Sequence, residues 1–268
     1  MTNPATEVAP WVERMARVGY AAKALLYITV GYLAAQAAVG SGGRVTDTQG
    51  ALRVVHDASY GRVLLFVVAA GLLGYGLWRV VEALLDPERR GTEWKALAVR
   101  AGFLLRGLFH GGLALTAFRL ALRERSGGAG DQVQGWTARA FDVPAGELLV
   151  GLAAAYVAGY GVYQFYRAWS PKMQRHLHLG ELPQDVRRWV LRVSRFGIAA
   201  RGVVFCFIGF FLMRAVLRHD AAEAGGLRES LRALANLGRW PFIAVALGLV
   251  AYGVYELLNA RYRRISIA

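Results

Sequence analysis

Three basic residues occupy the same place in three similar apolar stretches of the sequence. Lys23, Arg106 and Arg201 each follow a glycine by four residues and precede a small residue and an apolar run. A charged side chain within the hydrocarbon of a membrane costs about 2.5 to 3.5 kcal/mol on insertion scales. Two explanations fit this pattern: each side chain reaches out to lipid phosphates at the interface, or the three together form a site for an anion or a lipid headgroup.

Polar residues recur at two further matched positions, and each layer holds one basic, one acidic and one neutral side chain. The layers are Arg79, Gln164 and Glu256, and three residues later Glu82, Arg167 and Asn259. Matched positions should lie at similar depth, so we expect Arg79 to pair with Glu256 and Glu82 with Arg167, unless these acids pair with the basic residues described above. Either arrangement would offset part of the cost of burying charge and would be structural rather than catalytic.

The remaining reactive residue types give weaker signals. His110 is expected to be a packed, hydrogen-bonded aromatic rather than a proton relay, and the His176-Leu177-His178 stretch a surface loop rather than a metal site. The single cysteine, Cys206, excludes an intramolecular disulfide and a paired-cysteine metal site. We find no nucleophile elbow, phosphate-binding loop or convincing acid pair. The sequence therefore predicts no catalytic residue, no metal and no cofactor.

Six apolar stretches must position these side chains. The chain has 268 residues, of which 56% are hydrophobic, and a positive mean hydropathy of +0.33. About 20 apolar residues in a helix, at about 1.5 Å each, cross a hydrocarbon core of about 30 Å. The predicted fold is therefore an all-α polytopic membrane protein. Its predicted spans are Tyr20–Val39, Val63–Leu85, Ala101–Leu122, Leu148–Tyr166, Ile198–Leu217 and Phe242–Leu258.

The net charge of +14 at pH 7 could indicate a nucleic-acid partner, but the basic residues lie mostly between the apolar stretches. There they are more typical of residues that set topology and meet anionic lipid. Most of the 32 Lys and Arg residues fall on the side that would hold both termini. We therefore expect a membrane protein with both termini in the cytoplasm, and no nucleic-acid partner.

A repeated pattern organises these stretches into pairs. Arg17–Gly31, Arg100–Ala114 and Arg195–Gly209 share an interface arginine, a glycine two residues later and the basic residue described above. The alternate stretches share Gly-Tyr-Gly or Ala-Tyr-Gly, at 74–76, 159–161 and 251–253. Two crossings per repeat return the chain to its starting side, so the three repeats should be parallel and related by a pseudo-threefold axis along the membrane normal.

The Arg-x-Gly-x-x-x-Arg-Gly starts at Arg100 and Arg195 and the Gly-Tyr-Gly-x-Trp element at 74–78 resemble a bacterial membrane family known as domain of unknown function number 1206. The resemblance implies three tandem two-helix units and no particular activity. The expected division is a polar N-terminal segment (1–15), repeat 1 (16–87), repeat 2 (88–169), a cytoplasmic basic linker (170–193) and repeat 3 (194–264).

Two functions from different classes fit these observations. The first is a non-enzymatic scaffold or anionic-lipid-binding protein, with membrane lipid as its partner and, for a scaffold, a protein as well. The second is a small channel or transporter with a path along the pseudo-threefold axis or between repeats. An enzyme acting on a lipid or isoprenoid ranks third, because the sequence lacks an acid-rich motif.

Overall fold

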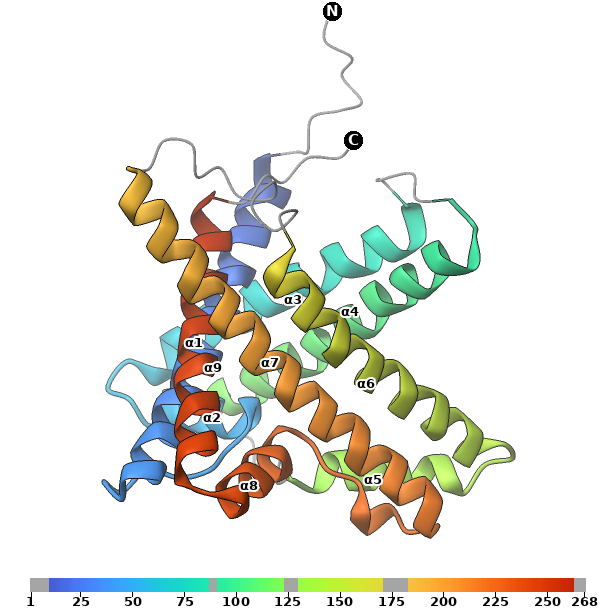
Figure 1. Ribbon diagram of the computed structural model, residues 1–268. Helices are drawn as coiled ribbons and strands as arrows, with labels where there is room; N and C mark the ends of the chain where they lie inside the picture. The colour runs from blue at the N-terminus through green and yellow to red at the C-terminus, as the bar shows by residue number, and fades with distance from the viewer. Residues whose placement is uncertain (1–9, 87–90, 123–129, 171–182, 263–268) are drawn as a thin grey trace, which may run out of the picture.

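The computed structural model describes residues 10–86, 91–122, 130–170 and 183–262, and within them every regular element is a helix. Six long helices form the body of the molecule (Figure 1). They are α1 (Pro10–Val39), α3 (Gly61–Leu85), α4 (Trp94–Ala121), α6 (Gly146–Trp169), α7 (Gln184–Arg218) and α9 (Arg239–Tyr262). All six are long and apolar enough to cross a membrane, which confirms the predicted polytopic all-α fold.

Several helices extend beyond the predicted apolar spans. α1 begins at Pro10, inside the expected polar N-terminal segment, and α7 begins at Gln184, inside the expected basic linker. In the structure the residues of that linker from Gln184 onward are the first turns of a membrane helix, because polar residues can continue a helix beyond the hydrocarbon.

Short helices lie across the end of the bundle opposite to the one where α1 begins and α9 ends (Figure 1). We call these ends the far end and the terminal end. The short helices are α2 (Thr48–His56), α5 (Gly130–Phe141), η3 (Ala221–Glu223) and α8 (Leu227–Leu237). α8 repeats leucine at positions 227, 231 and 234, and buries Leu231 and Leu234 beneath it. These amphipathic helices cover the far end of the core.

The closest helix pairs join successive repeats rather than the two helices of one repeat. They are α3 with α4, α6 with α7, and α9 with α1. Each pair meets at the last glycine of the Gly-Tyr-Gly or Ala-Tyr-Gly element. A Cβ added to Gly76 would lie 2.9 Å from the carbonyl oxygen of Gly107, and one added to Gly161 would lie 2.9 Å from that of Gly202. Small residues thus allow the backbones to approach, as is typical of helix packing in lipid.

Two of the three interface arginines cap helix ends at the terminal end. Arg17 of α1 donates from Nη1 to the carbonyl oxygens of Ala260 (2.7 Å) and Arg261 (2.8 Å) in the last turn of α9. Arg100 of α4 donates from Nε to the carbonyl oxygen of Ala83 (2.8 Å) in the last turn of α3. A cation at this position satisfies terminal carbonyl groups and favours the helix dipole. These arginines therefore fasten neighbouring repeats together.

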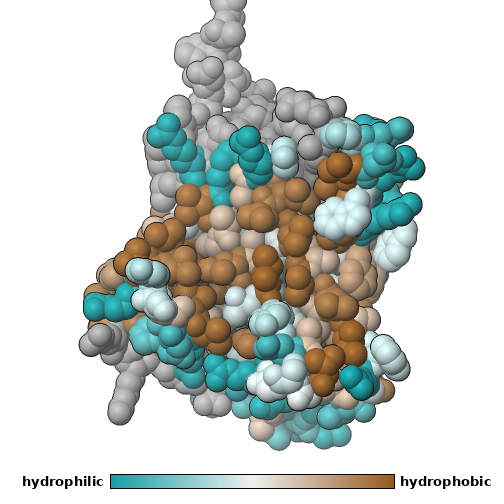
Figure 2. All heavy atoms as spheres, turned by 90° about the vertical axis from the view of Figure 1, so that its left-hand side faces the viewer, coloured by the Kyte–Doolittle hydropathy of each residue, from teal (hydrophilic) through white to brown (hydrophobic). Residues whose placement is uncertain are grey.

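The two halves of the bundle differ in polarity. The far half holds an apolar core in which side chains such as Val30, Leu65, Leu72, Ala117 and Leu249 are almost fully buried. The terminal half holds the buried charged residues. Figure 2 shows apolar side chains across the middle of the outer surface and hydrophilic ones above and below. This outer pattern matches a membrane-spanning bundle.

Candidate functional site

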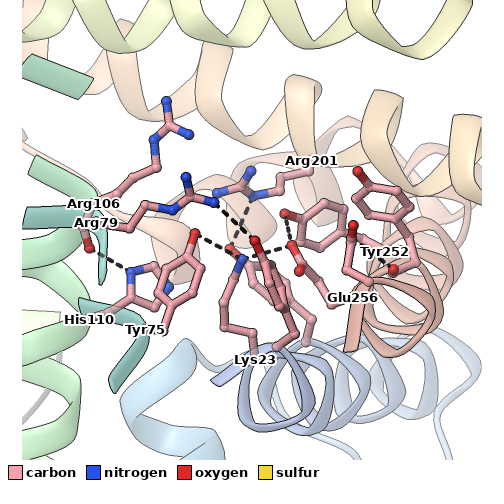
Figure 3. Close-up of polar contacts among 12 residues, drawn as sticks. Lys23, Tyr75, Arg79, Arg106, His110, Arg201, Tyr252 and Glu256 are labelled. Carbon is pink, nitrogen blue, oxygen red and sulfur yellow. Dashed lines mark hydrogen bonds and ion pairs between the residues drawn. The ribbon is translucent and has the colours of Figure 1, made fainter. Parts of the chain in front are cut away.

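The three matched basic residues do not share one environment. Lys23 of α1 and Arg201 of α7 are 4% and 7% exposed, and Arg106 of α4 is half-buried. Lys23 and Arg201 therefore lie in the interior of the bundle instead of reaching out to lipid phosphates. Figure 3 shows their side chains with those of Tyr75, Tyr252 and Glu256 around a common region.

Lys23 forms an ion pair with a carboxylate of the last helix. Its Nζ lies 2.8 Å from Oε1 of Glu256 in α9 and 3.4 Å from the hydroxyl of Tyr75 in α3. The same carboxylate oxygen accepts a hydrogen bond from the hydroxyl of Tyr252. Two buried opposite charges in contact offset part of their desolvation cost. The close packing of α1 on α9 brings these residues together.

Arg201 is surrounded by aromatic rings rather than by carboxylates. Its Nε donates to the hydroxyl of Tyr27, 3.2 Å away, and its guanidinium carbon lies 4.6 Å from the ring centre of Phe205 and 4.7 Å from that of Tyr252. Cation–π contacts of this kind are worth about 2 kcal/mol or more when they are desolvated. They stabilise the guanidinium but leave its positive charge uncancelled.

Arg106 and Arg201 contact the ring of the same tyrosine, Tyr160. The guanidinium carbon of Arg106 is 5.0 Å from the ring centre of Tyr160, and that of Arg201 is 6.0 Å from the same ring. Nε of Arg106 donates to the carbonyl oxygen of Gly102, 3.0 Å away, in the preceding turn. In the described part of the chain no carboxylate contacts Arg106. The structure thus brings the three matched basic residues around one set of tyrosines.

The polar layers pair differently from the expected arrangement. Arg79 forms an ion pair with Glu82 on the same helix, because residues three apart share a helix face. Glu256 pairs with Lys23 instead of Arg79, which is the second arrangement that the sequence left open. Arg167 donates to the hydroxyl of Tyr255, 2.5 Å away, instead of pairing with Glu82. The cross-repeat pairs Arg79 with Glu256 and Glu82 with Arg167 are therefore replaced by these contacts.

Several buried atoms of the polar layers have unused hydrogen-bonding capacity. Gln164 is 0% exposed, and neither its amide nitrogen nor its amide oxygen has a partner among the described residues. The same holds for Oε2 of Glu256, Oδ1 of Asn259 and Nε of Arg79. An unsatisfied buried polar atom costs about 1 to 3 kcal/mol. The polar layers thus contain buried donor and acceptor atoms without a hydrogen-bond partner among the described residues.

We call this group of charged side chains the cationic cluster. It consists of Lys23, Arg79, Arg106, Arg167 and Arg201, with the carboxylates Glu82 and Glu256. Aromatic rings lie between its members. The ring centre of Phe103, for example, lies 5.3 Å from the guanidinium carbon of Arg79 and 5.3 Å from that of Arg106. In the part of the chain that the structure describes, only the two carboxylates of the cluster contact its five basic side chains. The cluster therefore carries an excess of three positive charges.

The other candidate residues from the sequence do not belong to the cationic cluster. Nδ1 of His110 lies 2.8 Å from the carbonyl oxygen of Arg106, and its ring packs against Tyr75, so it has the packed, hydrogen-bonded environment expected of it. Cys206 packs against α6, where a Cβ on Gly161 would lie 2.7 Å from its sulfur. His176 and His178 lie outside the described residues. Among the residues described, no three potential metal ligands gather.

Sequence reasoning missed the tyrosines that surround the cationic cluster. Tyr75, Tyr160 and Tyr252 are the central residues of the three Gly-Tyr-Gly or Ala-Tyr-Gly elements, and each contacts at least one basic residue of the cluster. Their repetition was the available signal. The pattern was used only to recognise the repeats, although it also places the hydroxyl of Tyr75 beside Lys23 and that of Tyr252 beside Glu256.

Comparison with known proteins agrees with the repeat pattern. A family model described as Domain of Unknown Function (DUF1206) matches three times, at residues 18–86, 101–170 and 196–263. The chain is 29% identical over 268 residues to the uncharacterized protein YxxB of Bacillus subtilis (strain 168), and the match covers 99% of this chain and 96% of that protein. No solved structure matches the chain.

Proposed function

Because the chain belongs to the DUF1206 family, whose description names no activity, we propose from the site alone that it is a membrane protein that binds the headgroup of an anionic lipid in its cationic cluster. The proposed role is binding rather than catalysis. The group recognised would be a phosphate, whose oxygens match the guanidinium donors of arginine. The proposed location is the bacterial inner membrane.

The observation that carries this proposal is the excess of positive charge in the cationic cluster, in which Arg201 is buried and Arg106 and Arg167 are half-buried. A buried charge without a partner is strongly unfavourable, and a fold gains stability when a ligand of opposite charge cancels it. Arg201 is the clearest member, because it is buried and contacts aromatic rings instead of a carboxylate. A phosphate beside Arg201 and Arg106 would supply the missing negative charge.

The alternative of a channel along the axis has less support. In the far half of the bundle the interior is filled by apolar side chains, including Leu26, Val30 and Leu113. Among the described residues, the buried charged side chains all belong to the cationic cluster. Charges gathered in one cluster fit a bound headgroup better than they fit a continuous polar path.

The test removes one charge at a time from the purified protein. Arg201→Gln should weaken the binding of phosphatidylglycerol by about tenfold or more, since a charge-assisted hydrogen bond is worth about 1.5 to 3 kcal/mol. Binding would be measured by native mass spectrometry during a lipid titration. The stability of Arg201→Gln without added lipid is measured alongside, because the substitution removes an uncancelled charge together with its cation–π contacts and its hydrogen bond to Tyr27.

The matched control is Arg239→Gln, which changes an exposed arginine at the far end of the bundle. Its lipid affinity should equal that of the unmodified protein. Equal loss of affinity in both variants would indicate nonspecific attraction to a basic surface. Unchanged affinity in Arg201→Gln would contradict the proposed function.

A further inference from the structure

The two long helices of a repeat do not pack equally closely in all three repeats. In repeat 1, α1 packs against α3, and in repeat 3, α7 packs against α9, but the two long helices of repeat 2, α4 and α6, make little contact with each other. Figure 1 shows α4 and α6 crossing instead of running side by side. Repeat 2 therefore lacks the packing between its two long helices that repeats 1 and 3 share.

One residue accounts for this difference. Gly71 in α3, Tyr156 in α6 and Gly248 in α9 occupy matched positions, three residues before the shared Gly-Tyr-Gly or Ala-Tyr-Gly element. A Cβ added to Gly248 would lie 2.2 Å from Cβ of Ala200 in α7, so the glycine permits a close approach of α7 and α9. A Cβ added to Gly71 would lie 2.8 Å from Cγ1 of Val18 in α1.

In repeat 2 a side chain fills this position. A Cβ added to Gly102 of α4 would lie 1.9 Å from the hydroxyl oxygen of Tyr156. The matching glycine of α1, Gly19, instead meets the backbone of α3, since its added Cβ would lie 2.6 Å from the carbonyl oxygen of Gly71. The side chain of Tyr156 thus lies between α4 and α6, at the position where repeat 1 brings two backbones together.

This separation lies next to Arg106, a half-buried member of the cationic cluster. Arg106 follows Gly102 by one helical turn and is half-buried, whereas Lys23 and Arg201 are almost fully buried. Further into the membrane along the same two helices, Phe109 of α4 is 56% exposed and Leu152 of α6 is 59% exposed. A positive group bordered by exposed apolar side chains matches the chemistry of an acidic lipid, which joins a phosphate to acyl chains.

We propose that repeat 2 is a lateral port, through which one anionic lipid reaches the cationic cluster from the bilayer. Its phosphate lies at Arg106 and beside Tyr160, and its acyl chains lie along α4 and α6 toward the far end. This inference rests on the proposed function and adds the route and the repeat involved. Tyr156 acts as the spacer that keeps the port open.

The decisive variant is Tyr156→Gly, which gives repeat 2 the residue found in repeats 1 and 3. It removes no charge from the cationic cluster, yet it should let α4 and α6 close and weaken phosphatidylglycerol binding by about fivefold or more. Tyr156→Phe keeps the ring and should bind as the unmodified protein does. Unchanged binding in Tyr156→Gly would overturn the lateral port.

A second measurement uses the unmodified protein and so does not depend on how Tyr156→Gly folds. A phosphatidylglycerol analogue with a photoreactive group in its acyl chain is cross-linked to the protein in nanodiscs, and the labelled peptides are identified. Labels confined to α4 and α6 near Phe109 and Leu152 would support the port. Labels that require Arg106 but fall on α1 and α3, or on α7 and α9, would overturn it.

The two proposals fail in different ways. If Arg201→Gln loses affinity while Tyr156→Gly keeps it, the headgroup site stands and the port is wrong. If neither variant changes lipid affinity, the headgroup site itself is wrong. Inorganic phosphate at millimolar concentration distinguishes a soluble anion from a lipid. If it displaces phosphatidylglycerol, and the protein in nanodiscs without added phosphate shows no photolabel on α4 and α6, the site serves a soluble anion and the port is overturned.

Discussion

Glu256 is the carboxylate on which the balance of the cationic cluster depends most directly. It accepts hydrogen bonds from Lys23 and Tyr252 and is 2% exposed. Glu256→Gln would leave the ammonium of Lys23 buried without an opposite charge, which typically costs about 3 to 5 kcal/mol. We expect the free energy of unfolding to fall by that order, measured by denaturant titration in detergent micelles.

A double-mutant cycle separates this pair from general disruption. Lys23→Met combined with Glu256→Gln should recover part of the loss, because neither charge then remains unpaired. Asp185→Asn serves as the control, since Asp185 pairs with Arg188 on an exposed surface and should contribute no more than about 1 kcal/mol. Strictly additive effects of the two buried substitutions would show that Lys23 and Glu256 do not stabilise each other.

For the cationic cluster, the sequence predicted which residues are involved better than it predicted which residues they pair with. The repeat alignment placed Lys23, Arg106 and Arg201 at matched depth. In the structure Arg106 and Arg201 contact the same ring, that of Tyr160, and Lys23 pairs with Glu256, which accepts a hydrogen bond from the Tyr252 that also contacts Arg201. Depth alone does not say which way a side chain points around its helix. Arg79 therefore meets Glu82, three residues along the same helix, although its matched acid is Glu256.

At the scale of the helices, glycines decide which pairs can pack closely, and two glycines of α6 permit a matched test. Gly161 faces α7, where an added Cβ would lie 2.7 Å from the sulfur of Cys206, whereas an added Cβ on Gly159 would meet no atom within 4 Å. Gly161→Ala should therefore destabilise the protein by about 1 to 3 kcal/mol through overpacking.

Gly159→Ala is the control, because the same substitution two residues away should be neutral or stabilising by up to about 1 kcal/mol through helix propensity. Both variants would be compared by thermal unfolding in the same detergent. Equal stability of the two would mean that the approach of α6 to α7 does not depend on Gly161. The difference between the variants is more informative than either value, since both lie in one helix of one repeat.

The helices and their grouping into repeats followed from the sequence, but their neighbours did not. Apolar length predicted six spans, and the recurring Gly-Tyr-Gly or Ala-Tyr-Gly elements grouped them into three pairs. A packing face does not name its partner, however, and the closest pairs turned out to join successive repeats, as Gly76 with Gly107 and Gly161 with Gly202. The effect of Tyr156 on repeat 2 also depends on what stands opposite it, which is visible only once α4 and α6 are placed.

At the scale of the whole molecule, polarity is divided along the bundle. The far half is an apolar core covered by α2 and α8, while the terminal half contains the cationic cluster. Arginines near the terminal end cap neighbouring helices, so the charged half is also the half where the repeats are fastened together. A ligand that cancels the excess charge would thus act where the three repeats meet, and its binding should stabilise the assembly as a unit.

The orientation of this division in the membrane is the last prediction. Basic residues favour the cytoplasmic side, and they are concentrated toward the terminal end, so we expect that end to face the cytoplasm. Arg187 lies near the start of α7 at the terminal end, and Leu237 ends α8 at the far end; both are exposed. The chain has one cysteine, Cys206, so Cys206→Ala gives a background in which each position can be changed to cysteine alone.

In intact bacterial cells, a membrane-impermeant maleimide should label Leu237→Cys and should label Arg187→Cys only after the inner membrane is permeabilised. The reverse pattern would place the cationic cluster near the outer side of the membrane. It would also change the leaflet from which a lipid could reach Arg106, because the half-buried guanidinium lies in the terminal half of the bundle. The labelling pattern therefore decides which leaflet should supply the anionic lipid.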